Sequence, residues 1–243
     1  MNLILTSVMS RDTGTKQINN YQDRVKPFHI DQHHLIKRWI DSANNIKTSG
    51  IIFYDQISDK LLSTANTTIK FKQETKLTRS NHCDNRFYIY KEYLQQNKDI
   101  DNVFLTDCND VYFNKNPFDL MSNKYDLYVG SEYRPSRWCN QRFELINGYG
   151  VSWELPQDEK IRYNMGIIGG RRDQVLKFLE HIVSYMNHVE SSIGANTPAG
   201  ILTLHNHFDL SRVFTGQPLH NHFRMAGFED TEKTRGSAYI VHK

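Results

Sequence analysis

The sequence predicts an α/β fold in which a mostly parallel central sheet is flanked by helices on both faces. Short apolar runs alternate with amphipathic stretches along the chain, and strands that alternate with helices favour a parallel sheet. The 243 residues, 38% of them hydrophobic, are enough to build the core of one large domain. No linker rich in Gly, Ser or Pro divides them, so we expect a single domain spanning residues 1–243.

The first half of the chain predicts four strands and two helices. Apolar or alternating runs indicate strands at residues 2–10, 49–57, 67–75 and 102–107. A first helix is expected at residues 31–47, where one face carries Leu35, Ile36, Trp39 and Ile40. A second helix is expected at residues 85–99, where helical spacing relates Phe87, Tyr90 and Leu94.

The second half predicts three more strands and two more helices. Strands are expected at residues 125–133, 162–170 and 237–243. The longest helix is expected at residues 171–189, where an apolar stripe consists of Val175, Phe178, Leu179, Ile182 and Tyr185. A shorter helix should follow from about Pro198 to His205.

Composition and charge limit the classes of partner. The chain has 30 basic and 27 acidic residues, a net charge of +3, so charge gives no reason to expect a nucleic-acid partner. The N-terminal "MNLILTSVMSRD" is too short in its apolar part to span a membrane and lacks the features of a signal peptide. Three cysteines, odd in number and far apart, fit free thiols in a reducing compartment. We therefore expect a cytoplasmic protein with no membrane span, and its oligomeric state is left open.

A polar cluster follows the fourth expected strand, in "VFLTDCNDVYF". Asp107, Asn109 and Asp110 lie where open parallel sheets bind ligands, beyond the carboxyl end of a strand. Their oxygen atoms suit a hard divalent cation such as Mg²⁺ or Mn²⁺, which would also relieve the repulsion between two neighbouring carboxylates. The alternative is a polar turn whose side chains satisfy backbone N–H groups. A haloacid-dehalogenase-type phosphatase would use Asp107 as nucleophile, but it needs an Asp where Asn109 stands and normally carries this motif on its first strand.

Four segments in the same order resemble the GT-A glycosyltransferases, a family of nucleotide-sugar-dependent enzymes. "VFLTDCNDVYFNKNPFDL" is similar to their aspartate (DxD-type) motif, and "NRFYIYKEYLQQNKDIDNVFLTD" to the helix and strand before it. "YNMGIIGGRRDQVLKFLEHI" resembles their N-x-G-x-x-G strand and long helix, and "YIVHK" their terminal strand. The resemblance implies one GT-A (Rossmann-like) domain, with a nucleotide-binding half at about residues 1–110 and an acceptor-binding half at about 111–243.

The register of the aspartate motif is open. Counting back from "VYF" puts the family's paired acids on Cys108 and Asp110, whereas counting forward from the strand puts them on Asp107 and Asn109. We expect both Asp107 and Asp110 near the cation. The resemblance adds His242 as a nitrogen ligand, which suits Mn²⁺ somewhat more than Mg²⁺.

The resemblance also implies the remaining site residues. It assigns Asp110, Asn164 and Asn196 to the catalytic centre, and it assigns donor binding to Thr6, Ser7, Arg86, Asp107, Cys108, Asn109 and Lys243. The implied donor is a nucleoside-diphosphate sugar, with a UDP-sugar favoured, and the acceptor a hydroxyl of a glycan or glycoprotein. Trp138 and Arg137 lie in a loop-like stretch where an acceptor sugar could stack, although Trp138 is equally suited to the core. Enzymes of this type without an anchor occur in bacteria and large viruses.

Several alternatives stay open. Asn196 and Thr197 stand where many family members carry an acid, which favours retention of configuration slightly, but Asp209 or Glu154 could supply a base. The repeated "LHNHF" offers a zinc site made of His205, His207, His220 and His222, a weak possibility because the first copy falls at a helix end. A carbohydrate- or nucleotide-binding module of the same fold, without turnover, is the non-enzymatic reading.

Overall fold

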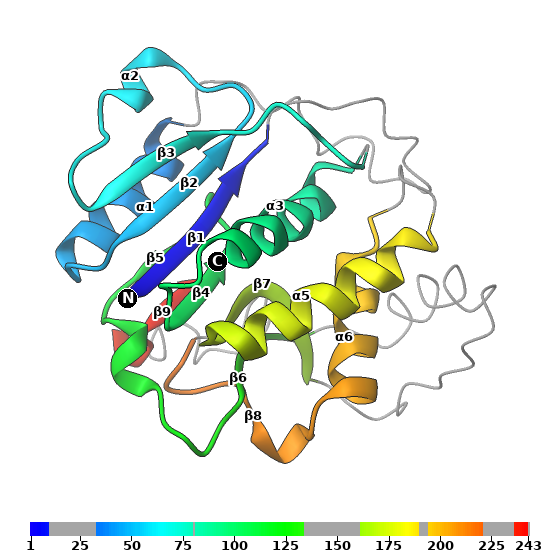
Figure 1. The fold of residues 1–243 in the computed structure, drawn as a ribbon. Helices are drawn as coiled ribbons and strands as arrows, with labels where there is room; N and C mark the ends of the chain where they lie inside the picture. The colour runs from blue at the N-terminus through cyan, green and yellow to red at the C-terminus, as the bar shows by residue number, and fades with distance from the viewer. Residues whose placement is uncertain (10–32, 80, 134–160, 190–193, 221–235, 243) are drawn as a thin grey trace.

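The computed structural model describes residues 1–9, 33–79, 81–133, 161–189, 194–220 and 236–242. Its central sheet contains seven strands: β1 (Asn2–Val8), β2 (Gly50–Tyr54), β3 (Ile69–Gln73), β4 (Asn102–Thr106), β6 (Leu127–Tyr133), β7 (Ile161–Arg171) and β8 (Val213–Phe214). They lie in the order β3-β2-β1-β4-β7-β6-β8 (Figure 1). Strand β7 is antiparallel to both neighbours, and the other pairs are parallel. The expected mostly parallel sheet of a Rossmann-like α/β domain is therefore confirmed.

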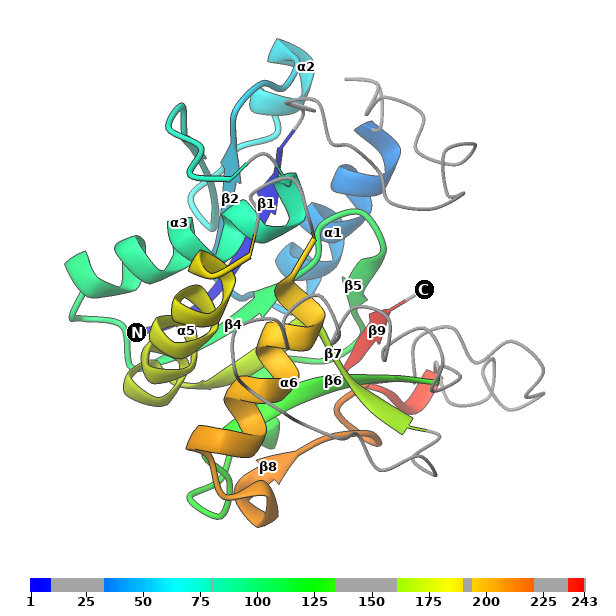
Figure 2. The ribbon, with the colours of Figure 1, turned by 90° about the vertical axis from the view of Figure 1, so that its right-hand side faces the viewer.

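Two layers of other elements cover the sheet, and Figure 2 shows them on opposite sides. On one face lies α1 (His33–Asn45), together with a small antiparallel sheet made of β5 (Val111–Phe113) and β9 (Ile240–His242). On the other face lie the three longest remaining helices, α3 (His82–Gln96), α5 (Arg172–Asn187) and α6 (Asn196–His207). Shorter pieces are α2 (Asp59–Leu62) and the 3₁₀ turns η1 (Pro117–Leu120) and η2 (Leu210–Arg212).

The central strands β1 and β4 contain continuous apolar runs, because both faces of the sheet are buried there. In β1, Leu3 and Leu5 pack in the cluster beneath α3, α5 and α6, while Ile4 between them packs in the cluster beneath α1. Strand β4 repeats this alternation, with Val103 and Leu105 on one side and Phe104 on the other. Successive side chains of a strand point to opposite faces, so continuous apolar runs fix these strands at the centre of the sheet.

Element boundaries differ from the predictions mainly at the ends. Helix α3 runs over His82–Gln96 rather than 85–99, α6 over Asn196–His207 rather than about 198–205, and β9 is confined to Ile240–His242. The elements α2, β5 and β8 were not predicted, because two to four residues are too few to show a period. The structure thus confirms the strongly periodic segments and adds the short ones.

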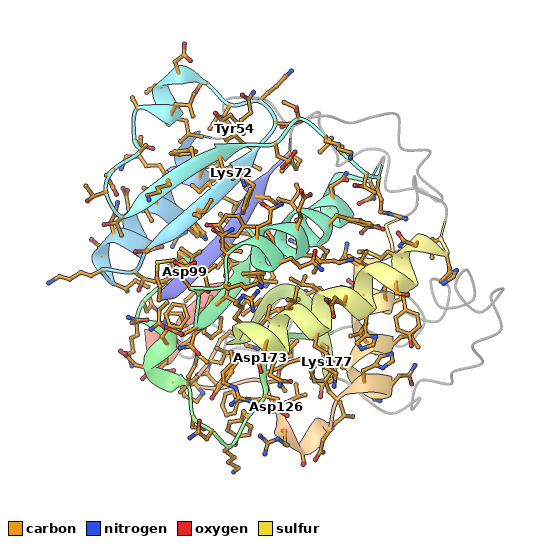
Figure 3. The ribbon with its side chains drawn as sticks, viewed as in Figure 1. Tyr54, Lys72, Asp99, Asp126, Asp173 and Lys177 are labelled. Carbon is orange, nitrogen blue, oxygen red and sulfur yellow. The ribbon has the colours of Figure 1, made fainter. Side chains whose placement is uncertain are left out.

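Helices α5 and α6 meet through a stacked pair of histidine rings, those of His181 and His207. Their centroids are 3.6 Å apart and their planes differ by 6°. Lys177 of α5, labelled with Asp173 in Figure 3, donates from its Nζ to the backbone oxygen of His207 at 3.0 Å. Burial lowers the pKa of His207 below its ordinary value of 6.5, and the positive charges of His181 and Lys177 lower it further.

Acidification should therefore destabilise the α5–α6 contact. A group with a depressed folded-state pKa contributes stability that is present above its unfolded pKa, here 6.5, and is lost as pH falls through the folded value. We expect the melting temperature of the wild-type chain to fall more than that of His207→Gln between pH 7 and pH 5. Thermal unfolding scans of the two proteins at both pH values test this. An equal fall in melting temperature for the two proteins would contradict it.

Candidate metal centre and ligand pocket

A pocket lies where the order of the sheet reverses. Strand β1 has β2 on one side and β4 on the other, so the chain winds in opposite directions from this point, which is where open α/β sheets bind ligands. The pocket has a volume of about 300 Å³. Its lining comes from the ends of β1 and β4, from β7, and from the beginnings of α3 and α6: Ser7, Val8, Met9, Cys83, Arg86, Asp107, Cys108, Asn109, Asp110, Asn164, Met165, Gly166, Asn196 and Thr197.

Three potential metal ligands converge at one edge of this pocket. Asp107, Asp110 and His242 each offer a ligand atom, and these atoms all lie within 4.8 Å of one another. The Nε2 atom of His242 is 3.5 Å from Oδ2 of Asp107 and 3.5 Å from Oδ2 of Asp110. The two carboxylates are partly exposed and the histidine is buried, so the donor set is open on the pocket side. Two carboxylates and one imidazole fit Mn²⁺, and less closely Mg²⁺.

The two-stranded sheet explains how a residue near position 240 reaches the acids after β4. The chain turns through Asp107–Asp110 directly into β5, and β9 pairs with β5 so that His242 stands opposite Val111. Further main-chain bonds hold β9, including Asn114 N to Tyr239 O at 2.9 Å and Ile240 N to Leu219 O at 2.8 Å. The β5–β9 register therefore places the imidazole beside Asp110.

A bulge in β7 brings its backbone to the same place. The pairing with β6 shifts from Val129–Ile168 to Gly130–Asn164, so that Met165, Gly166 and Ile167 fall outside this register. The backbone oxygen of Gly166 accepts from the N–H of Asp107 at 2.9 Å. Bulges commonly occur next to functional sites, where they redirect a strand. Here the bulge fixes Asp107, the first residue of the acidic turn, residues 107–110.

Arg86 occupies the wall beside the acids. It lies on α3, one turn after Cys83, and its guanidinium forms an ion pair with Oδ1 of Asp107. Its Nη2 donates to the backbone oxygen of Met165 at 3.2 Å. The side chain is 13% exposed, so a positive charge is presented to the pocket at low solvent exposure. A planar guanidinium in this position is suited to binding phosphate oxygens.

The predicted donor residues of β1 and of the acidic turn divide into two groups. Ser7 and Asn109 line the pocket. Thr6 does not: its side chain is fully buried and donates to the backbone oxygen of Thr106 at 2.8 Å, so its assignment to donor binding stays a prediction. Cys108 lines the pocket but is 3% exposed, and burial raises the pKa of its thiol to about 12. Without a bound cation the thiol is therefore neutral at pH 7.

Both predicted asparagines line the pocket, each held by a buried acid. Asn164 donates from Nδ2 to Oε2 of Glu132 at 3.0 Å, and its Oδ1 accepts from the N–H of Gly166 at 2.7 Å. Asn196 donates from Nδ2 to Oδ1 of Asp84 at 2.8 Å. Glu132 and Asp84 were not predicted as partners, because neither stands in a motif and burial of a single acid leaves no periodic signal.

A buried ion pair, Arg79–Asp84, fastens three helices around the pocket. Arg79 Nε is 3.2 Å from Oδ2 of Asp84, and both side chains are less than 5% exposed. The Oδ2 atom also accepts from the N–H of Ala195 just before α6, and Arg79 Nη1 donates to the oxygens of Met186 and Val189 at the end of α5. These bonds use backbone groups at or just beyond the ends of α5 and α6. The sequence analysis did not predict this role, because the backbone groups that the pair binds lie about 110 residues further along the chain.

Several predicted residues fall elsewhere. Lys243, Trp138, Arg137 and Glu154 lie outside the described residues. Asp209 is exposed, accepts from Ser211 N at 3.0 Å, and is not part of the pocket lining. His220 is buried, and its Nε2 accepts from the N–H of Ser131 at 3.0 Å. Among the described residues, no cluster of three metal ligands includes His205, His207 or His220, so the zinc reading gains no support there.

Comparison with known proteins adds no family assignment. No protein-family model matches the chain, and no curated protein matches it either. Within the described ranges, none of the helices combines the length and apolar character that crossing a membrane requires. The functional argument therefore depends on the fold and on the geometry of the pocket.

Gly166 gives a direct test of the metal centre. A Cβ at this position would overlap Cε1 of His242 and come within 2.6 Å of Oδ2 of Asp107, so Gly166→Ala has to displace both ligands. We expect Mn²⁺ affinity, measured by calorimetry, to fall about 10- to 100-fold, the range for disturbed support of metal ligands. Gly236→Ala is the matched control, because nothing lies within 4 Å of its Cβ position. Equal Mn²⁺ affinity in the two variants would refute the assignment.

Proposed function

We propose that the chain is a metal-dependent glycosyltransferase of the GT-A type, moving a sugar from a nucleoside diphosphate to an acceptor hydroxyl. The observation that carries the proposal is the Asp107–Asp110–His242 cluster, which lies where the order of the sheet reverses. Arg86 lines the same pocket. A cation site beside a guanidinium matches a ligand with adjacent negative oxygens, as a diphosphate has. The resemblance of the four sequence segments points to the same class.

Each residue has a definable task in this reaction. Asp107 and Asp110 hold the cation with His242, and Arg86 binds a phosphate oxygen of the donor. Ser7, Val8 and Met9 line the pocket beyond β1 and bound the nucleoside. A Mn²⁺ or Mg²⁺ ion held there acts as a Lewis acid that stabilises the negative charge of the departing diphosphate. Asn164 and Asn196, which line the same pocket, contact the transferred sugar.

Of two other readings, the phosphatase receives less support. A phosphatase nucleophile at Asp107 needs an oxygen directed at the substrate, whereas Oδ1 is engaged by Arg86 and Oδ2 faces His242. It also predicts a phospho-aspartate, which mass spectrometry detects. A binding module without turnover shares every contact described above, so it differs from the enzyme only in product formation.

Ligand screening and donor hydrolysis test the proposal. The melting temperature should rise with UDP, GDP or their sugars UDP-glucose, UDP-galactose, UDP-N-acetylglucosamine and GDP-mannose, and only when Mn²⁺ is present, because a ligand of the native state stabilises it. The bound nucleotide sugar should then release free nucleoside diphosphate slowly without acceptor. Binding without release identifies the module, and no shift with any donor rejects the proposed function.

Removing a ligand of the cation should remove turnover without unfolding the chain. We expect Asp110→Asn to lower Mn²⁺ affinity by about 100-fold or more and donor hydrolysis to background, and His242→Ala to weaken the Mn²⁺ dependence. Asp119→Asn, an exposed acid of η1, is the control. Undiminished hydrolysis in Asp110→Asn at low Mn²⁺ would contradict the role of this carboxylate.

Arg86→Ala should weaken binding of the free nucleoside diphosphate more than it weakens binding of Mn²⁺. The guanidinium supplies a charge-assisted bond to phosphate, a contribution of about 1.5–3 kcal/mol, or roughly 10- to 150-fold in affinity. Isothermal titration with UDP or GDP in saturating Mn²⁺ measures it. Lys98→Ala, an exposed base just beyond α3, should change neither affinity, and a similar loss in both variants would sink the assignment.

A further inference from the structure

The two asparagines of the pocket share a feature that the proposed reaction does not require. Each directs its amide nitrogen at a buried carboxylate from another element: Asn164 at Glu132 of β6, and Asn196 at Asp84 of α3. Glu132 is 2% exposed and Asp84 is 0% exposed. Neither acid lines the pocket, whereas both asparagines do. Among the described residues, the acids therefore contact the pocket lining through the asparagines that they hold.

The geometry at Asn164 fixes the orientation of the amide from both ends. Its Nδ2 is 3.0 Å from Oε2 of Glu132, and its Oδ1 is 2.7 Å from the N–H of Gly166. A reversed amide would set its oxygen against the carboxylate oxygen and its NH₂ against a backbone N–H, so both bonds would be lost and replaced by repulsion. The identity of each amide atom thus follows from its partner.

The β7 bulge gives this amide its place. Asn164 pairs with Gly130, two residues before Glu132, so Asn164 and Glu132 are diagonal neighbours on one face of adjacent strands. Beyond Asn164, the bulge carries Gly166, whose Cβ position is crowded by Asp107 and His242. The fixed amide therefore stands between the buried acid and the metal centre. In a nucleotide sugar the diphosphate joins the sugar to the nucleoside. With the nucleoside bound beyond β1, the group beside this amide is the sugar.

We infer that Glu132 is a positioning residue for sugar recognition, acting through Asn164; the inference rests on the proposed function. With one lone pair of Oδ1 and one hydrogen of Nδ2 committed, the amide keeps one acceptor site and one donor hydrogen in fixed directions. Such a pair recognises a hydroxyl group, which donates and accepts. Glu132 sets those directions and does not touch the ligand. Asp84 likewise accepts from Nδ2 of Asn196, whose Oδ1 accepts from Oγ1 of Thr197 at 3.3 Å.

The test separates sugar affinity from nucleotide affinity. The probes are the nucleotide sugar that gives the largest shift in the screen above and its free nucleoside diphosphate, both titrated in saturating Mn²⁺. Glu132→Met removes the acceptor at similar length, and we expect it to weaken nucleotide-sugar binding about three- to tenfold, the effect of one hydrogen bond, with no change for the free diphosphate. Glu132→Gln keeps a carbonyl acceptor and should restore most of the affinity.

A double-mutant cycle distinguishes positioning from general stability. If Glu132 acts through Asn164, then Glu132→Met should have no further effect on sugar affinity in the Asn164→Ala background. Additive losses, or equal losses for the nucleotide sugar and the free diphosphate, would overturn the inference while leaving the proposed function intact. If the wild-type chain binds neither probe, both fail together. Should Glu132→Met not fold, Glu132→Asp, which withdraws the carboxylate by one methylene, gives the same cycle.

Discussion

The site depends on the three-residue pairing between β5 and β9. Two carboxylates and an imidazole are brought within 4.8 Å of one another, although the acids follow β4 and the histidine comes from more than 130 positions further along the chain. At one end of the acidic turn, the N–H of Asp107 donates to the backbone oxygen of Gly166. At the other end, the pairing of β5 with β9 sets His242 opposite Val111. Without that ladder, Asp107 and Asp110 would form an ordinary polar turn, and like charges would separate them.

The remaining walls of the pocket follow from the sheet order. Because β1 and β4 are central neighbours at the reversal of winding, their carboxyl ends meet, and helices that begin on that side direct their first turns at the same space. Helix α3 contributes the guanidinium of Arg86, and α6 contributes the amide of Asn196. The β7 bulge supplies backbone groups and Asn164. The polar groups come from five elements, which is why no short sequence motif contains them.

The sequence allowed prediction of the parts of this arrangement that have a local signal. Strand β4 was evident from Val103–Leu105, and the acids at its end followed from the position of Asp107 and Asp110 after a buried strand. His242 came only from resemblance, because nothing in "YIVHK" indicates which strand it pairs with. Thr6 was assigned to the donor because strand ends face ligands, but alternation turned its hydroxyl to Thr106 and left Ser7 at the pocket. Asp84 and Glu132 were not predictable, because burial of an acid depends on partners far along the chain.

The Arg79–Asp84 pair has a mechanical consequence for the pocket. Its bonds join the start of α3, the end of α5 and the start of α6, and the acid that closes the clip also holds Asn196. A buried pair of this kind is costly to break when only one partner is removed. The wall that carries Cys83, Arg86, Asn196 and Thr197 is therefore held by bonds that α3, α5 and α6 share. Loss of Asp84 would break the contacts of this pair with the helices and the bond to Asn196 at the same time.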